Sequence, residues 1–246
     1  MFVQIQKKYQ FILLTLMTLF LAGCETFNSQ LATSAAVDVI QAVTLSDGQI
    51  RQLSQQTADN LDSKHTLAPE NNPYHQRLAR LIAPHQNISG IQFDFRVYLK
   101  GDVNAFALPN GTIRVYSGLM DKLTDDELFF VIGHEIGHVI EGHSKRAAQV
   151  TYTTSAARKG VAALGGKPGA IAQSAIGEFS AQLISAQFSQ HEERQADDYG
   201  LNFIRNHQTN PAAAVSALRK LGNQGGGLLS SHPNPQDRAN RLESKL

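Results

Sequence analysis

The chain has 246 residues, of which 42% are hydrophobic and 17% are charged. This composition can bury one sizeable core, so it excludes a chain that is disordered throughout. Lysine and arginine number 22 against 21 acidic residues, and a balance this close excludes the electrostatic footprint of a nucleic-acid-binding protein.

The N-terminal segment, residues 1–23, has the parts of a secretory signal. Two lysines precede an apolar run, residues 11–23, which is too short to span a bilayer comfortably. The next residue, Cys24, is the only cysteine, so no intrachain disulfide can form. Residues 21–24 (LAGC) resemble the bacterial lipoprotein box, which implies cleavage before Cys24 and a lipid on its thiol. The alternative is an uncleaved N-terminal membrane helix with an incidental cysteine.

The resemblance divides the chain into three parts. We expect a lipoprotein signal peptide at residues 1–23, a lipidated tether at residues 24–45 and one folded domain at residues 46–246. Glu25 follows the cysteine; by resemblance to enterobacterial sorting, this favours the outer membrane, facing the periplasm.

Helices and strands follow in that order. Residues 45–61 carry apolar side chains at helical spacing after a Ser-Asp cap signal, and residues 73–82 read as a second amphipathic helix. Residues 92–98 and 112–116 alternate polar and apolar side chains like half-buried strands. Between them, the sequence Pro-Asn-Gly at residues 109–111 indicates a turn at a sheet edge.

The second half of the chain reads as helical. Thr124 and Glu127 form a capping box that begins this run, and glycine-rich stretches at residues 164–169 and 225–227 interrupt it. Helices, a small antiparallel sheet and then more helices predict the α+β class with few strands. We expect the alanine- and glycine-rich residues 156–175 to be packed helices.

His134 and His138 lie four residues apart in the helix that begins after Thr124. Both imidazoles therefore share one face and can reach a single ion. Glu135 is rotated from His134 by about 100°, so it can approach a metal-bound water as a general base without occupying the metal. Apolar neighbours argue against two solvent-facing histidines, because a buried histidine needs a partner. The pattern predicts a zinc hydrolase.

A catalytic zinc site normally has three protein ligands. On a continuous helix His143 would lie about 180° from His134, so we expect it to be a satisfied polar residue or to stabilise the helix end. The best donor is the acidic segment 189–200, where Glu193 and Asp197 share a helix face. One of these two could ligate zinc while the other orients a ligand histidine. The alternative is an ordinary solvated acidic face.

Residues 193–197 (ERQAD), following a His-Glu-x-Gly-His helix, resemble the gluzincin metallopeptidases that include the CAAX prenyl endopeptidases and the heat-shock protease HtpX. Residues 104–119 (NAFALPNGTIRVYSGL) are similar to the segment that precedes the zinc helix in this family. His-Pro at residues 232–233 resembles an element of many periplasmic members. The resemblance covers residues 73–242 and implies a mostly helical zincin-like fold.

The family pattern implies a role for each matching position. His134 and His138 are expected to be zinc ligands, with Glu135 as the general base. Glu193 is expected to be the third ligand. Asp197 is expected to orient a ligand histidine without binding the zinc itself.

One position departs from the pattern. Many members carry a glutamate where this chain has Gln195, and we expect this change to tune the site rather than abolish it. Glu192 remains the rival to Glu193 as third ligand.

Asn104, Ala105, Phe106 and Ala107 are expected to form an exposed edge strand beside the zinc helix. Such an edge offers unpaired backbone groups, to which a substrate peptide can add as another strand. The alternative is a plain hairpin with Phe106 in the core. Both can hold, since alternate residues of a strand face opposite ways.

His232 follows the glycine-rich stretch 225–227. Our hypothesis is that this loop lies over the cleft, where His232 acts either as a temporary fourth zinc ligand or as a transition-state donor. The alternative is a surface loop.

These residues predict a zinc-dependent endopeptidase with one zinc ion per chain. The resemblance and the expected compartment imply that its substrates are misfolded or unassembled cell-envelope proteins. Its partners would be polypeptide substrates and, through the lipid anchor, a membrane. An envelope assembly factor or chaperone with little proteolysis is the alternative function. The intact Glu135 favours retained catalysis, because binding alone needs no general base.

Overall fold

A computed structural model describes residues 46–163, 171–222 and 228–246, without the side chains of residues 155–163 and 171–175. The expected signal peptide and tether, residues 1–45, lie outside this range. The two glycine-rich stretches also lie outside it, so the expectation for residues 156–175 stays untested.

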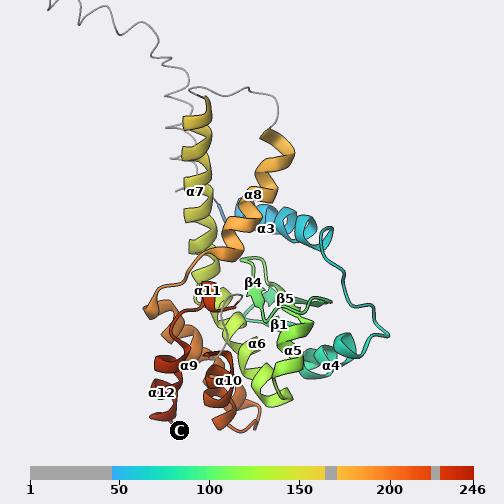
Figure 1. Ribbon diagram of the computed structural model, residues 1–246, viewed down its shortest axis with the longest axis vertical. Coiled ribbons are helices and arrows are strands. Elements are labelled where there is room, and N and C mark those ends of the chain that lie inside the picture. The colour runs from blue at the N-terminus through green and yellow to red at the C-terminus, as the bar shows by residue number, and fades with distance from the viewer. Residues whose placement is uncertain (1–45, 164–170, 223–227) are drawn as a thin grey trace, which may run out of the picture.

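Helices make up most of the described chain, and short strands are confined to its first half (Figure 1). The helices are α3 (Asp47–Asp62), α4 (Pro73–Ile82), the short 3-10 helix η1 (Ala83–His85), α5 (Ser117–Lys122), α6 (Asp125–Ile140), α7 (His143–Ala163), α8 (Ile171–Ser185), α9 (Gln190–Asn206), α10 (Ala212–Gly222), α11 (Leu228–Ser231) and α12 (Pro235–Glu243). The strands are β1 (Asn87–Ile88), β2 (Ile91–Gln92), β3 (Asp94–Tyr98), β4 (Ala105–Ala107) and β5 (Thr112–Tyr116). The predicted α+β class is confirmed.

Side-chain caps fix where the main helices begin. Ser46 caps α3 and Thr124 caps α6, each through a capping box closed by the third helical residue. Ser189 caps α9 in the same way, with Glu192 as the closing residue. The helices expected at residues 45–61 and 73–82 are therefore present, the second with the predicted bounds.

The three-stranded sheet has the order β3-β5-β4 and is mixed rather than antiparallel. As expected, β4 and β5 form an antiparallel hairpin around the turn at residues 108–111. In contrast, β3 pairs with β5 in parallel, with Asp94 opposite Thr112. The expectation of a purely antiparallel sheet was wrong, because β4 reverses the chain between the two longer strands and leaves them running in the same direction.

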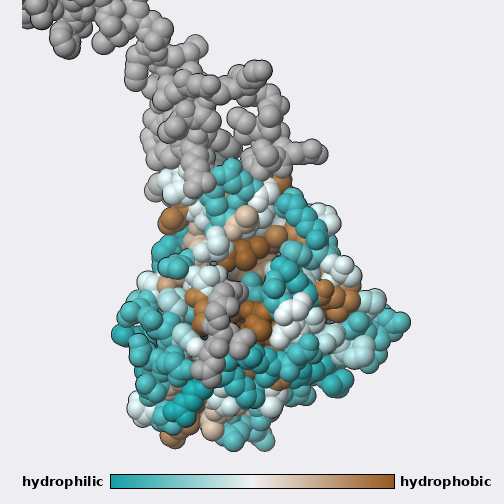
Figure 2. Space-filling view, in the orientation of Figure 1, coloured by the Kyte–Doolittle hydropathy of each residue, from teal (hydrophilic) through white to brown (hydrophobic). Residues whose placement is uncertain are grey.

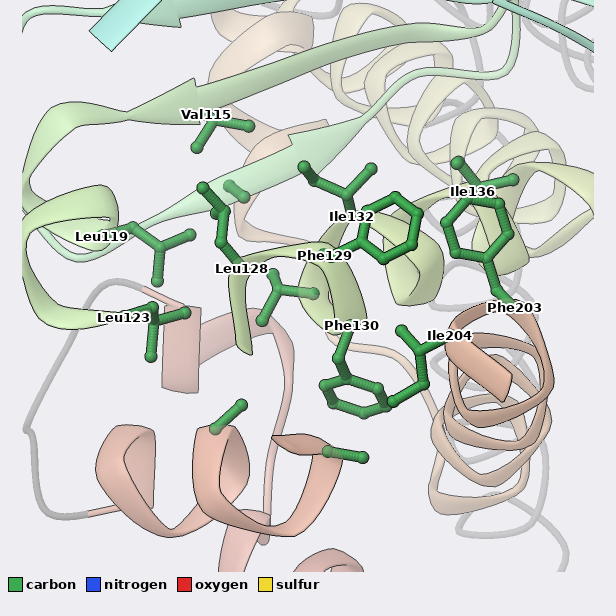
Figure 3. Packing of buried hydrophobic residues seen from close by; sticks show 14 of the residues in the cluster. Val115, Leu119, Leu123, Leu128, Phe129, Phe130, Ile132, Ile136, Phe203 and Ile204 are labelled. Atoms are coloured by element: carbon green, nitrogen blue, oxygen red, sulfur yellow. The ribbon is translucent and has the colours of Figure 1, made fainter. Parts of the chain in front are cut away.

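Helix α6 is the centre of the core, and all its residues from Glu127 to Val139 are buried. Figure 3 shows Leu128 near Val115 and Leu119 on one side of α6, and Phe203 and Ile204 of α9 on the other. A helix enclosed on all sides needs apolar residues around its whole circumference, which is the pattern of its sequence.

Helices α6 and α9 approach closely because glycines lie at their contact. A Cβ on Gly137 would lie 2.9 Å from Tyr199 Cβ and 3.2 Å from Ala196 Cα. On the opposite helix, a Cβ on Gly200 would lie 3.1 Å from the His134 backbone nitrogen. This contact brings the histidines of α6 next to the acidic residues of α9.

Among the described residues, no helix is both long enough and apolar enough to cross a bilayer.

Candidate metal centre

Four buried side chains from three parts of the chain offer ligand atoms to one point. They are His134 and His138 of α6, Glu193 of α9 and His232, which follows α11, and their ligand atoms all lie within 4.8 Å of one another. His134 Nε2 lies 3.0 Å from His138 Nε2 and 3.3 Å from His232 Nδ1. Glu193 Oε1 lies 3.4 Å from His138 Nε2 and 2.9 Å from His232 Nδ1.

These donors fit a tetrahedral metal ion. Bonds of about 2.0–2.1 Å in a tetrahedral zinc site separate the ligand atoms by about 3.3–3.4 Å, close to the observed separations. Imidazole nitrogens with a carboxylate oxygen are also the ligand chemistry that zinc accepts. Glu135 Oε1 is buried and accepts no hydrogen bond from the described residues, so it has a lone pair for another partner.

Asp197 contacts His134 on the side of the ring that faces away from the ligand cluster, as the spacing on α9 suggested. Its Oδ1 lies 3.1 Å from His134 Nδ1, so the opposite ring nitrogen, Nε2, faces the ligand cluster. Burial alone would raise the pKa of Asp197, but the charge of Arg238 and the hydrogen bond with His134 lower it to about 2. The carboxylate therefore stays ionised and accepts a hydrogen bond from the ring.

Positive charge also keeps Glu193 ionised. Burial opposes this, but His232 and Arg238, with hydrogen bonds from His138 and His232, hold the pKa of Glu193 well below its usual range. Burial moves the pKa of His138 well below its usual value. A neutral imidazole and an ionised carboxylate are the forms that bind a metal.

Glu135 lies beside the cluster without belonging to it. Its Oε1 is 3.6 Å from His232 Nε2, and its side chain is 2% exposed. The rotation between consecutive helical residues directs it away from the ligand positions of His134 and His138.

His143 also lies next to the site, although the argument from a continuous helix did not anticipate it. Helix α6 ends at Ile140, and Gly142, with φ of +74°, turns the chain back before α7 begins at His143. A left-handed glycine after a helix is a common way to end it. The assumption of a continuous helix was therefore wrong, whereas the conclusion holds: His143 is outside the ligand cluster and is hydrogen-bonded.

Glu192, the alternative to Glu193 as third ligand, makes other contacts. Its Oε2 accepts from the Ser189 backbone N–H at 2.8 Å, and its Oε1 pairs with Arg146. Both carboxylate oxygens of Glu192 therefore have partners outside the ligand cluster, which does not include this residue.

Among the described residues β4 (Ala105–Ala107) has a partner strand on one side only, so the expected edge position is present. The expectation that this edge is exposed was wrong for Ala105, which is 1% exposed because it packs in the core. The register opposite β5 directs the backbone groups of Ala105 and Ala107 to the open side. Asn104 Oδ1 accepts from the Ala105 N–H at 3.0 Å, and Phe106 is 7% exposed and packs in the core.

No pattern in the sequence indicated Arg238 as a residue of the site. This residue of α12 donates from Nε and Nη2 to both carboxylate oxygens of Asp197, at 2.9 and 2.7 Å, and its Nη1 pairs with Glu193. Arginine occurs on many surface helices, so only the tertiary contact distinguishes this one.

A pair of histidines one helical turn apart, a carboxylate from a second helix and a neighbouring glutamate define the metal centre of a metalloprotease. The sequence model of peptidase family M48 matches residues 69–246, so this chain belongs to peptidase family M48.

Relatives agree with that assignment. Metalloprotease LoiP of Escherichia coli (strain K12) is 41% identical over 92% of each chain, and metalloprotease YcaL of the same organism is 32% identical over 92% of each chain. The beta-barrel assembly-enhancing protease of that organism is 29% identical over 79% of this chain and 43% of its own length.

Proposed function

We propose that this metalloprotease is a zinc-dependent endopeptidase that cleaves misfolded or unassembled proteins of the cell envelope. The observation that carries the proposal is the convergence of His134, His138 and Glu193 beside a buried oxygen of Glu135 that accepts no hydrogen bond from the described part of the chain. One zinc ion per chain would be held by those three residues. When bound, zinc polarises the scissile carbonyl and makes a water molecule nucleophilic near neutral pH.

The chain's own residues supply the proton transfers. Glu135 takes a proton from the attacking water and delivers it to the leaving amide nitrogen. Asp197 holds the His134 ring in the orientation that directs Nε2 to the metal. Arg238 neutralises the charge that the two carboxylates of α9 bring into the core.

His232 suits the gating role better than the role of a transition-state donor. Its Nδ1 is one of four mutually adjacent ligand atoms, while its Nε2 faces Glu135. A catalytic zinc site keeps one position open for water and substrate. A fourth protein ligand in that position would hold the enzyme inactive until substrate displaced it.

Substrate would bind along the open side of β4. The backbone groups of Ala105 and Ala107 that do not pair with β5 can pair with an extended peptide. Beside the metal centre, Val131, Leu218 and Leu221 are among the apolar residues that line a pocket reaching His134 and Glu135. Figure 2 shows hydrophobic surface in the middle of one face, framed by hydrophilic surface. Extended segments with apolar side chains are exposed in unfolded proteins and buried in folded ones.

We further propose the location. The lipoprotein-box sequence at residues 21–24 and the similarity to LoiP support a lipid on Cys24 and an envelope location, at the outer membrane facing the periplasm. In this arrangement residues 24–45 are the tether and residues 46–246 are the protease domain.

A role in assembly with little proteolysis is the second candidate. It is favoured by the likeness to the beta-barrel assembly-enhancing protease. The discriminating observation is whether a variant without the general base still keeps an unfolded outer-membrane β-barrel protein from aggregating.

The proposed function is tested by degradation of casein, an unfolded substrate, by wild type and Glu135→Gln. We expect wild type to be active, chelator to abolish activity and zinc to restore it. Glu135→Gln should bind zinc normally and lose activity by roughly 10²- to 10⁴-fold, the usual contribution of a general base. Wild-type activity in Glu135→Gln would contradict the mechanism.

A further inference from the structure

Behind His138, away from the ligand cluster, a second pair of polar side chains continues the hydrogen-bonding chain. His143 Nδ1 lies 3.1 Å from His138 Nδ1, and His143 Nε2 lies 3.2 Å from Gln195 Oε1. His138 and His143 are 0% and 1% exposed. Three side chains from α6, α7 and α9 therefore form a single line that ends at the metal centre.

This line is held in place by the fold around it. The left-handed Gly142 turns the chain so that His143, the first residue of α7, comes back over the end of α6. The Phe188 ring covers both imidazoles, with its centroid 3.9 Å from that of His138 and 6.4 Å from that of His143. The two rings are therefore shielded from bulk water, and on this side of His138 the hydrogen bonds run to His143 and from His143 to Gln195.

The direction of the hydrogen bonds decides whether His138 can be a ligand. A neutral imidazole carries one hydrogen, on either Nδ1 or Nε2. To offer the Nε2 lone pair to a metal, His138 must carry its hydrogen on Nδ1 and donate it to His143 Nδ1. His143 then carries its own hydrogen on Nε2 and donates it to Gln195 Oε1. All three side chains are satisfied in this direction.

The same three side chains can also form these hydrogen bonds in the opposite direction. If the Gln195 amide rotates so that its NH₂ group donates to His143 Nε2, then His143 donates from Nδ1 to His138 Nδ1. His138 now carries its hydrogen on Nε2, which faces His134 Nε2 at 3.0 Å. In this form His138 has no lone pair for a metal. A glutamine supports both directions because it has a donor and an acceptor, whereas an ionised carboxylate only accepts.

We propose that His143 and Gln195 are positioning residues that set the tautomer of His138 and thereby its affinity for the metal. The proposal rests on the zinc site described above, but it concerns metal binding and not cleavage. It predicts that a glutamate at position 195 tightens zinc binding, because only the ligand-competent direction remains. An apolar residue there weakens binding, because His143 loses the partner that orients it.

The first test measures zinc affinity of the full-length protein by competition with a chelator. We expect Gln195→Glu to bind zinc about threefold or more tightly than wild type, and Gln195→Leu and His143→Leu about 10- to 100-fold more weakly, the usual effect of losing a partner behind a metal ligand. His143→Gln, whose amide oxygen can accept from His138, should recover part of the loss. Gln149→Leu, a half-buried glutamine of α7 outside this line, is the matched control and should bind like wild type.

The second test reads the tautomers directly, by NMR of zinc-loaded protein labelled with ¹⁵N at histidine. We expect His138 to carry hydrogen on Nδ1 and His143 on Nε2 in wild type. Because Gln195→Glu keeps the shape of the side chain, a purely structural role for Gln195 would leave its zinc affinity unchanged.

Equal zinc affinity in wild type, Gln195→Glu and Gln195→Leu would overturn the proposal, as would a hydrogen on Nδ1 of His143 in the zinc-loaded protein. If wild type itself bound no zinc, the zinc site would be refuted instead, so the two failures are distinguishable.

Discussion

Arg238 binds both carboxylate oxygens of Asp197 through two hydrogen bonds, although 41 residues separate them in sequence. The pair is buried, and the same guanidinium also contacts Glu193. Helix α12 thus supplies the cation that stabilises the acidic side chains on α9. The metal centre depends on this helix as well as on the histidine motif.

Replacing Arg238 by methionine should make the protein depend more strongly on metal. Removing one partner of a buried ion pair costs about 3–5 kcal/mol, because the other charge stays buried without compensation. We expect the free energy of unfolding, measured by urea titration with chelator, to fall by that amount. Zinc should recover more stability in Arg238→Met than in wild type, since it replaces the lost positive charge next to Glu193. An equal gain in both proteins would argue against this role.

Glu193 and its neighbour Glu192 should respond in opposite ways to alanine substitution. Glu193→Ala removes the carboxylate of the cluster and leaves only neutral imidazoles, so we expect the zinc content of the purified protein to fall well below one per chain, because the ion loses its attraction to an opposite charge. Glu192→Ala removes a helix cap and should keep the metal while costing about 1 kcal/mol of stability. Metal analysis of both variants checks the prediction, and retention of zinc by Glu193→Ala would refute the proposed ligand.

His232→Ala should increase activity. Loss of a fourth ligand frees the open coordination position and uncovers Glu135. We expect the rate of casein degradation to rise by roughly tenfold, equivalent to about 1.4 kcal/mol of inhibitory contact removed. A fall of about 10²-fold or more would instead identify His232 as a transition-state donor, and an unchanged rate would remove both roles.

Glu127 should govern part of the acid stability. It accepts hydrogen bonds from Ser216 Oγ at 2.6 Å, and from Lys220 Nζ and the Thr124 N–H at 2.7 Å each. Burial would raise the pKa of Glu127, but these three partners, led by Lys220, lower it below its usual 4.5. A depressed carboxylate pKa contributes stability that is fully present above the unfolded pKa and is lost as pH falls through the folded one.

The measurement is urea unfolding of Glu127→Gln and wild type across pH. We expect a deficit of about 1–2 kcal/mol in the variant near pH 7, from the lost bonds to a charged group. This deficit should close below about pH 4.5, where wild type also loses the charge. Asp126→Asn, in the same helical turn but exposed, is the control and should lose no more than about 0.5 kcal/mol. A deficit independent of pH would contradict the prediction.

Gly137→Ala should separate α6 from α9. The new Cβ would meet Tyr199 Cβ at 2.9 Å and the backbone of Ala196 at 3.2 Å. Overpacking of this kind costs about 1–3 kcal/mol, and the shift should also weaken zinc binding. Gly48→Ala is the matched control, because its Cβ would meet nothing closer than Ser46 Oγ at 3.8 Å, and alanine stabilises a helix by about 1 kcal/mol. Thermal unfolding with and without zinc distinguishes the two.

Features that depend on neighbouring residues could be predicted from the sequence. The starts of α3 and α6 and the bounds of α4 follow from capping residues and spacing, which act within one or two turns, whereas the end of α6 at Ile140 was not predicted. The pairing of His134 with His138 follows from the same short range. The direction of β3 relative to β5 could not be predicted in this way, because it depends on which side of β5 the intervening strand occupies.

The sequence alone determined the two histidines, the adjacent glutamate and the acidic segment that holds the third carboxylate. Only the tertiary structure decided that Glu193 faces the histidines while Glu192 caps its helix. It also decided that His232 belongs to the cluster and that Arg238 pairs with Glu193. The physical reason is the distance along the sequence over which each interaction acts. Helical geometry relates residues a few positions apart, whereas the contact of α6 with α9 depends on close packing between segments some sixty residues apart, which no local pattern records.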